Sequence, residues 1–361
     1  MSLRALKSGY QRSLVVNPSI LLLITVATAG AQWKIARTNS TADLRGIHNL
    51  GTGVIWAGGA NGTVLRSEDD GYLWQTCIIP PGASKLDFRG VFGWDANHAV
   101  VMSIGNGVSS RLYETTDGCA NWHLLFENPD RDGFWDAITF RRNAGYILGD
   151  PVDGRFAVYR SVDVGRHWRR DSSSELATAS DSEGAFAASN SSIVAGPGPK
   201  LLIATGGIGG PRVIRSEAPG RWNIARVPLA GGKESAGIFS IAFRDSSHGI
   251  AVGGDYKEPA QTAGTAAWTS DGGATWQSAT SFPSGYRSSV SWELTSHTWI
   301  AVGPNGSDLS MDDGRTWRRF DSGNWNALSL PWVVGPNGRI ASLDTVSGAF
   351  RNAVGTKLNR K

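Results

Sequence analysis

The sequence predicts an all-β protein, a seven-bladed β-propeller whose last blade is completed by a strand from the start of the chain. Three observations lead to this prediction: a turn motif that recurs along the chain, the regular spacing of its copies, and four short strand-like stretches in each interval. The composition agrees, because the 361 residues include 46 Gly and 15 Trp but only 3 Met. With 18% charged and 40% hydrophobic residues, the chain is neither disordered nor fibrous.

The recurring motif has the form Ser/Thr-x-Asp-x-Gly-x-x-Trp. Four copies are complete and lie at residues 67–74, 161–168, 269–276 and 310–317. Three further copies are altered: the glycine of 115–122 comes one place early, 216–222 is one residue short and lacks the Asp, and 342–344 has no Trp. Neighbouring copies are roughly 40–50 residues apart, which is the range of propeller blades.

This motif, an Asp-box, is predicted to fasten a hairpin turn. Its Asp can accept backbone N–H bonds, its Gly supplies a left-handed conformation, and its Trp offers an apolar face to a neighbouring hairpin. A residue that recurs once in every blade cannot belong to one catalytic site. The residues to which we assign the structural role are Asp69, Trp74, Asp117, Trp122, Asp163, Trp168, Asp271, Trp276, Asp312 and Trp317.

Each unit contains four predicted strands. An apolar strand such as 239–243 comes first, a second strand ends in glycine as at 249–253, a third leads into the Asp-box, and the Trp opens a fourth. The seventh unit, from Trp325 to Leu343, contains only three of these strands. We expect Trp33–Ala36 to supply the missing strand, which closes the ring and leaves no free sheet edge.

Residues 1–31 have the features of a cleaved signal peptide. The leader is basic and contains no acidic residue, an apolar stretch follows at 20–27, and Ala29-Gly30-Ala31 supplies small residues for cleavage. The apolar stretch is shorter than the roughly 20 residues that span a bilayer, although an uncleaved membrane anchor is the alternative. We expect an exported protein, periplasmic or secreted, with no transmembrane segment in the mature chain. Its expected parts are a signal peptide at 1–31, the propeller at 32–350 and a basic tail at 351–361.

The charge balance excludes a nucleic-acid-binding domain. The formal net charge is +4, and Arg4, Lys7 and Arg12 of the leader account for three of these charges. The remaining chain is almost neutral and lacks the basic stripe that nucleic acids require. Its two cysteines, Cys77 and Cys119, are too few for a disulfide scaffold, and the sequence leaves open whether they are bridged.

Linear motifs of catalysis are missing from the sequence. It contains no Gly-x-Ser-x-Gly elbow, no Phe-Arg-Ile-Pro string of the sialidase type and no dinucleotide fingerprint. His98, His248 and His297 occupy the same place in three different units, so a shared metal site is not expected. We therefore predict no cofactor, no metal and no catalytic residue. A pair of glycosidase carboxylates could nevertheless face the channel without any linear motif.

Positions that depart from the repeat are the candidates for binding, because a site needs unlike groups from several blades. Glu183 is expected to start the inner strand of unit four, and Arg287 opens unit six beside an aromatic residue. Mixed charge that converges on the channel mouth would suit a ligand or a protein partner. The alternative is that these charged residues belong to ordinary solvated turns and to salt bridges between blades. The residues that we assign to this surface are Asp150, Glu183, Arg212, Asp255, Tyr286 and Arg287.

The Asp-boxes, the seven units and the export signal together resemble the photosystem II assembly/stability factor family and its relatives in non-photosynthetic bacteria. The blade-opening strings at 44–47 and 88–91 and the Ala-Val-Gly strands at 251–253 and 301–303 add to this resemblance. It covers the chain from about Trp33 to Leu343. The resemblance implies a non-enzymatic scaffold that binds a protein partner, such as a membrane complex or its assembly intermediate.

In a photosynthetic source, the resemblance would place the protein in the thylakoid lumen. We expect a monomer. The alternative function is that of a secreted Asp-box glycosidase, a sialidase-like protein or a lectin, because such proteins carry the same motif. The identity of the partner and the source of the chain are not readable from the sequence.

If the predicted signal peptide is cleaved on export, mass spectrometry of the soluble periplasmic or secreted protein should find Gln32 at or near its N-terminus. Replacing Ala31 by Phe should block cleavage, because the peptidase requires a small residue at that position. An intact Met1 on the soluble exported form would contradict the predicted signal peptide.

Overall fold

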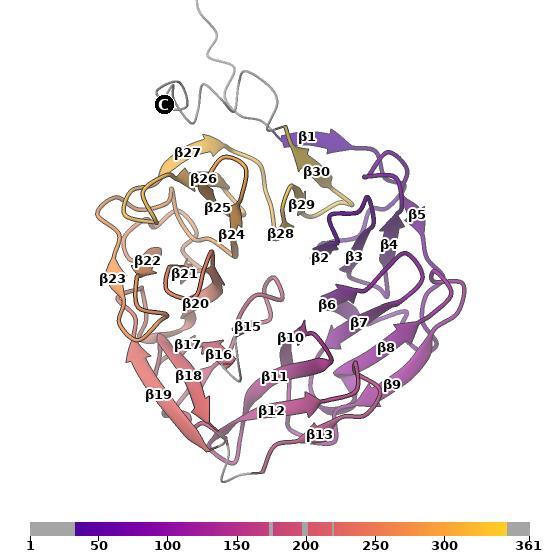
Figure 1. Cartoon of the computed structure of the whole chain (residues 1–361), viewed down its shortest axis with the longest axis horizontal. Helices are drawn as coiled ribbons and strands as arrows, with labels where there is room; N and C mark the ends of the chain where they lie inside the picture. Colours follow the sequence, from indigo (N-terminus) through magenta and orange to yellow (C-terminus); the bar gives the residue numbers. More distant parts are fainter. Residues whose placement is uncertain (1–32, 173–175, 197–200, 219, 345–361) are drawn as a thin grey trace, which may run out of the picture.

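The computed structural model describes residues 33–172, 176–196, 201–218 and 220–344. The expected signal peptide and basic tail lie outside these residues. Regular structure in the described part is β-strand, apart from one 3₁₀ turn at Gly107–Ser109. Seven sheets surround a central axis (Figure 1), so the all-β, seven-bladed propeller is confirmed. None of these described residues forms a helix with the length and apolar character needed to cross a membrane.

Each of the first three blades is a meander of four antiparallel strands, numbered from the axis outwards. Blade 1 consists of β2 (Leu44–Asn49), β3 (Ile55–Gly59), β4 (Val64–Ser67) and β5 (Gln75–Thr76); blade 2 of β6 (Asp87–Gly93), β7 (Ala99–Ile104), β8 (Arg111–Thr115) and β9 (His123–Glu127); and blade 3 of β10 (Trp135–Arg141), β11 (Ala144–Val152), β12 (Arg155–Ser161) and β13 (Arg169–Arg170).

The other four blades repeat this order. Blade 4 consists of β15 (Ile193–Ala195), β16 (Leu201–Ala204), β18 (Arg212–Ala218) and β19 (Arg221–Arg226); blade 5 of β20 (Lys233–Phe243), β21 (Gly249–Asp255), β22 (Ala266–Thr269) and β23 (Gln277–Ser278); blade 6 of β24 (Ser289–Glu293), β25 (Thr298–Gly303), β26 (Gly306–Ser310) and β27 (Arg318–Asp321); and blade 7 of β28 (Ala327–Ser329), β29 (Trp332–Val334), β30 (Ile340–Leu343) and β1 (Trp33–Ala36).

Blade 4 departs from the meander through two short additional strands. β14 (Glu183–Gly184) pairs with β17 (Gly206–Gly207), and β17 pairs with β20, so the sheet of blade 5 has six strands. The expectation that Glu183 starts the inner strand of unit four is therefore wrong, because that strand is β15 and begins at Ile193. Residues 185–192, which join β14 to β15, are called the channel segment below.

Strands from both ends of the described chain meet in blade 7. β1 pairs with β30 in an antiparallel register that joins Trp33 to Leu343 and Ala36 to Ile340. The indole of Trp33 also packs against Trp325, with ring centroids 5.9 Å apart. Its Nε1 donates a hydrogen bond of 2.9 Å to Ser307 Oγ of blade 6. The first strand thus joins the last blade and contacts the blade before it.

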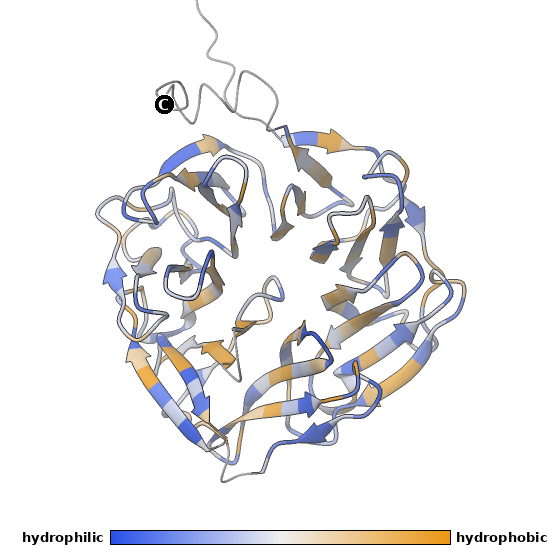
Figure 2. Ribbon diagram, viewed as in Figure 1, coloured by the Kyte–Doolittle hydropathy of each residue, from blue (hydrophilic) through white to orange (hydrophobic). Residues whose placement is uncertain are grey.

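The hydrophobic core lies between neighbouring blades rather than in one central mass. One cluster joins Leu44 and Ile55 of blade 1 to Trp332 and Ile340 of blade 7. Further clusters of the same kind join the other six neighbouring pairs of blades. Figure 2 shows the matching apolar stretches along strands all around the ring. Each blade therefore needs a neighbour on both faces.

The Asp-box turns show the hydrogen bonds that their composition predicts. In the first copy, Ser67 Oγ donates to Asp69 Oδ1 over 2.9 Å, and the same oxygen accepts the N–H of Gly71 over 2.9 Å. Asp69 Oδ1 also accepts the N–H of Leu73. The copies that begin at Ser161, Thr269 and Ser310 repeat this pattern. A Cβ at Gly71 would collide with Trp332 of blade 7, so this glycine allows the blades to approach closely.

The altered Asp-box of blade 2 has a cysteine where the complete copies have glycine. Cys119 has a φ of +66°, in the left-handed region, and its N–H donates to Thr115 Oγ1 over 3.0 Å. Its sulfur is bonded to Cys77, the residue after β5. The bridge that the sequence left open therefore exists in the structure, and it joins the outer edge of blade 1 to the turn of blade 2.

The contacts of Trp33 predict a large loss of stability for Trp33→Ala. The side chain is 6% exposed, and removing a buried Trp costs about 3–5 kcal/mol of unfolding free energy. Ile35→Ala on the same strand is the matched control, because Ile35 is 58% exposed and its truncation should cost less than about 0.5 kcal/mol. Chemical denaturation measures both variants. Equal stability of the two would show that the Trp33 packing does not hold blade 7.

Candidate ligand-binding site

Four inner strands carry a β-bulge, within the first three residues of β2, β6 and β10 and in the middle of β20. The register of the strand pairs skips one residue in each of β2, β6, β10 and β20. At a bulge, the side chain of the unpaired residue departs from the regular alternation of side chains between the two faces of the sheet. The bulged residues are Arg45, Arg89, Asp136 and Phe239, and all four line cavities.

The channel segment crosses the space between the inner strands and contacts four blades. Arg89 Nη1 of blade 2 donates to the carbonyl of Ala187 over 2.6 Å. Asn190 Oδ1 accepts the N–H of Ile138 in blade 3 over 2.7 Å. In the opposite direction, Ser189 Oγ donates to the carbonyl of Ser288 at blade 6 over 2.6 Å, and Ser191 Oγ donates to Ser240 Oγ of blade 5 over 2.8 Å. Figure 1 shows this loop, next to the label of β15, in the middle of the ring.

The first cavity at the axis, of about 430 Å³, is lined by arginine and aromatic side chains, and we call it the arginine cavity. Phe186 of the channel segment stacks on Phe239 at 3.9 Å between ring centroids, and Tyr286 meets Phe239 edge-on at 4.7 Å. Burial raises the pKa of Tyr286, so its phenol stays neutral at physiological pH. Aromatic walls beside cationic groups suit a ligand with apolar and anionic parts.

The two arginines of this cavity differ in how much of their hydrogen-bonding capacity is used. Arg89 Nε donates to Asp87 over 2.9 Å, in addition to its bond to the channel segment. Arg45 reaches Asp43 only at 3.4 Å. Within the described residues, Arg45 Nε is buried and has no hydrogen-bond partner. Burial and the nearby Arg45 lower the pKa of Arg89. An anionic group bound here would satisfy Arg45 and reduce the repulsion between the two guanidinium groups.

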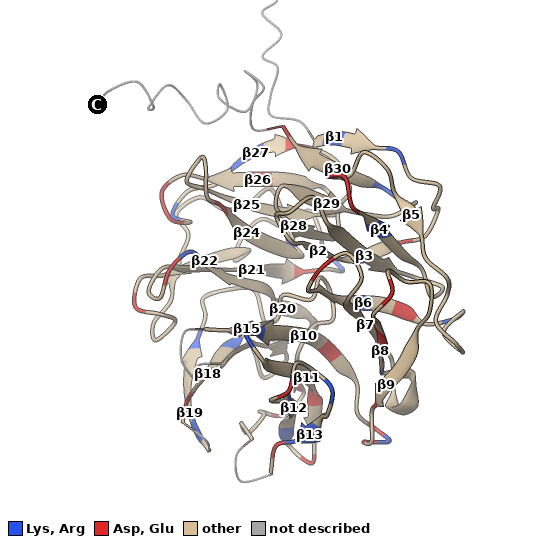
Figure 3. Cartoon of the chain, turned by 45° about the vertical axis from the view of Figure 1, so that its right-hand side comes forward, with Lys and Arg blue, Asp and Glu red and all other residues tan. Residues whose placement is uncertain are grey.

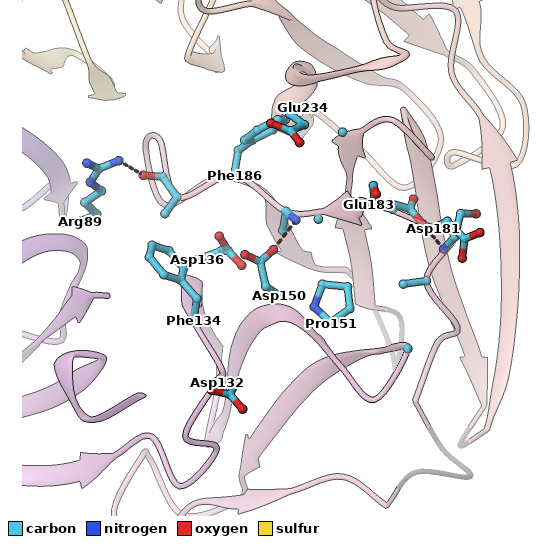
Figure 4. A pocket seen from close by; sticks show the side chains of 18 residues that line it. Arg89, Asp132, Phe134, Asp136, Asp150, Pro151, Asp181, Glu183, Phe186 and Glu234 are labelled. Carbon is cyan, nitrogen blue, oxygen red and sulfur yellow. Dashed lines mark hydrogen bonds between the residues drawn. The ribbon is translucent and has the colours of Figure 1, made fainter. Parts of the chain in front are cut away.

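The second cavity, of about 820 Å³, is rich in carboxylates, and we call it the acidic cavity. Arg89, Phe186 and Ala187 line both cavities, so the two adjoin. Figure 4 shows Asp136 and Asp150 with their carboxylates turned to the same space. The acidic side chains that line it are Asp132, Asp136, Asp150, Asp181, Glu183 and Glu234.

Asp136 and Asp150 are the central pair of the acidic cavity. Asp150 Oδ1 accepts the N–H of Ala185 over 2.9 Å. Asp136 is 1% exposed, and its Oδ2 has no hydrogen-bond partner among the described residues. Burial, together with the charge of Asp150, raises the pKa of Asp136 well above its usual range, and Arg89 only partly opposes this shift. Burial also raises the pKa of Asp150.

Four of the six predicted binding residues are buried and form ion pairs instead. Arg287 is fully buried, and its Nε donates to Asp308 over 2.7 Å. The N–H of Arg287 donates to Gly253 in the preceding blade, as the N–H of Leu44 donates to Gly335. Arg287 therefore occupies the buried position that Leu44 has in blade 1, and it is not available to a partner at the channel mouth.

The pair Glu183–Arg212 is also internal. Arg212 Nε donates to Glu183 Oε1 over 2.7 Å, and the two residues are 8% and 6% exposed. This ion pair joins β14 to β18. Asp255 is 4% exposed and accepts a hydrogen bond of 3.0 Å from Lys233. Of the six predicted residues, Asp150, Glu183 and Tyr286 line the cavities, and only Asp150 and Tyr286 do so without an ion pair.

Sequence reasoning missed Arg45, Arg89, Asp136 and Phe186 as site residues. Arg45 and Arg89 stand in the blade-opening strings, and each lies between a buried apolar residue and a glycine. That shared pattern could have identified them. Nothing local marks Phe186, because its position depends on the path of the channel segment. Within the described residues, no group of three or more His, Cys, Asp or Glu side chains could hold a metal ion.

Comparisons with known proteins show the fold. No family model and no curated protein matches the chain. The solved structure "YCF48 from Cyanidioschyzon merolae" is 18% identical, with a TM-score of 0.62 over 87% of this chain and 99% of that one. The structure "YCF48 bound to D1 peptide" is 16% identical, with a TM-score of 0.61 over 87% and 98%. The structure "Structure of U3-55K" is 14% identical, with a TM-score of 0.60 over 87% and 100%. These proteins share the propeller with this chain.

The environment of Asp136 predicts that Asp136→Asn raises stability at high pH. An acid whose pKa is raised on folding loses stability as the pH climbs from its unfolded pKa of about 3.9 through its folded pKa. The melting temperatures should therefore be similar at pH 4, and the variant should melt roughly 2–4 °C higher at pH 8. Calorimetry at both values tests this.

Asp271→Asn is the control, and its expected change in melting temperature has the opposite sign. Asp271 accepts backbone N–H bonds from Ala274 and Thr275, so its loss should lower the melting temperature at pH 8. If the wild type and Asp136→Asn had equal melting temperatures at both pH values, burial of the Asp136 carboxylate would not destabilise the folded protein.

Proposed function

We propose that this protein is an exported, non-enzymatic binding and assembly scaffold that holds a segment of a protein partner at the arginine cavity. The observation that carries the proposal is the buried Arg45 Nε, which has no hydrogen-bond partner among the described residues, beside Arg89 in a cavity walled by aromatic side chains. The segment is expected to bring a carboxylate, from an acidic side chain or a chain end, and an apolar neighbour. The likeness in fold to YCF48, one structure of which contains a D1 peptide, supports a protein partner.

The wider environment of the site agrees with a partner of mixed character. Figure 3 shows acidic and basic residues interspersed over the loops on the side drawn, which is unlike the basic surface of a nucleic-acid-binding protein. The disulfide between Cys77 and Cys119 supports an oxidising compartment such as the periplasm. A membrane complex or its assembly intermediate remains the proposed partner, and the propeller is proposed to act as a monomer.

A glycan-active enzyme is the second candidate, and the acidic cavity is the observation that favours it. A carboxyl group whose pKa is raised beside a second carboxylate is one arrangement of glycosidases. Fluorogenic sialosides and glucosides decide between the two functions. Turnover that Asp136→Asn abolishes would support the enzyme, and no turnover by the folded protein would favour the scaffold.

The scaffold predicts that Arg45→Glu weakens capture of the partner without unfolding the protein. Loss of a charge-assisted hydrogen bond costs about 1.5–3 kcal/mol, which corresponds to roughly 10- to 100-fold in affinity. Affinity capture from the periplasm and membrane fraction of the source organism, scored by mass spectrometry, measures recovery. Arg318→Glu is the matched control, because Arg318 is exposed on the outer strand β27. Equal recovery by the two variants would show that the partner binds elsewhere.

A further inference from the structure

The acidic cavity carries more negative charge than its surroundings neutralise. Glu183 is paired with Arg212, and Arg89 is paired with Asp87. Among the described residues, no ion pair involves the other five lining acids, namely Asp132, Asp136, Asp150, Asp181 and Glu234. The space is therefore a region of negative potential.

Two β-bulges create the central pair of this cavity. The register of β10 skips Asp136 after Trp135, and the register between β11 and β12 skips Asp150 after Gly149. Trp135 and Gly149 are themselves partners across the sheet. The two bulges therefore lie next to each other on neighbouring strands. Figure 4 shows that the carboxylates of the two aspartates face the same space.

The buried Asp136 Oδ2, which has no hydrogen-bond partner among the described residues, independently points to a ligand in this cavity. A buried acceptor without a hydrogen bond is costly, and a buried carboxylate without a partner is more so. Here the group is 1% exposed and lines a cavity that is large enough for a ligand. A bound cation would supply the missing hydrogen bond and the missing positive charge together.

We propose that the acidic cavity binds an alkylammonium or guanidinium group between Asp136 and Asp150. Phe134, Pro151 and Phe186 form apolar walls next to the pair, which suits the methylene stem that joins such a group to its parent molecule. An organic cation fits better than Ca²⁺ or Mg²⁺, which take six or more oxygen ligands, because no group of three or more His, Cys, Asp or Glu among the described residues could hold a metal ion. This site does not depend on the proposed function of the arginine cavity.

The cation has two possible sources, a free diamine or a lysine or arginine side chain of a peptide. Calorimetric titration with agmatine and with cadaverine tests the free source, and 1,5-pentanediol serves as the neutral control. Titration with the peptide Ala-Leu-Ala-Lys-Ala-Leu-Ala, and with the same peptide carrying norleucine for lysine, tests the peptide source. Each titration uses the wild type, Asp136→Asn and the control Glu68→Gln, which removes an acid from the exposed Asp-box turn of blade 1.

We expect the wild type and Glu68→Gln to bind at least one cationic probe, and not its neutral counterpart. Asp136→Asn should bind that probe at least 10-fold more weakly. Binding of agmatine or cadaverine assigns the site to free diamines, and preference for the lysine peptide alone assigns it to a protein side chain. The proposal is overturned if the folded wild type binds no cationic probe, or if Asp136→Asn binds as well as the wild type. Either result leaves the Arg45 capture experiment unaffected.

Discussion

Each blade of this protein buries its apolar residues against its two neighbours, so both faces of every blade are buried only if the ring is closed. A four-stranded sheet has two faces, and a blade at an open end would expose one of them to water. The pairing of β1 with β30 meets this condition, because it completes the sheet of blade 7 that packs against blades 6 and 1. The inner strands, their bulges and the two cavities keep their positions only within this closed ring.

The parts of the structure that the sequence predicted are those that local chemistry determines. The Asp-box needs particular residue types at fixed spacing, because Asp69 and its equivalents bond to backbone groups within the same turn. The number of strands in the last unit likewise showed that one strand was missing. A cysteine at the left-handed position of the second box was harder to recognise, because the glycine at residue 118 obscured the register.

The site was predicted less well, because it depends on backbone register. A shift of one residue turns a strand side chain from the core to the channel. Arg287 and Arg45 look alike in the sequence, yet Arg287 lies at the buried position and has Asp308 as its partner, whereas Arg45 lies at the bulge and faces a cavity. Likewise, the path of residues 185–192 follows from contacts with four distant blades, which no pattern within the segment reveals.

The channel segment forms part of the wall between the two cavities, so a movement of this segment would affect both. Phe186 and Ala187 form part of the wall of both, and Arg89 holds the carbonyl of Ala187 from the side of blade 2. A ligand that displaces this wall in one cavity changes the shape of the other. Thermodynamic linkage makes such an effect reciprocal, since each occupant changes the affinity of the other by the same factor. If the two proposed ligands both bind, this segment of eight residues is the physical link through which the anion and the cation would affect each other.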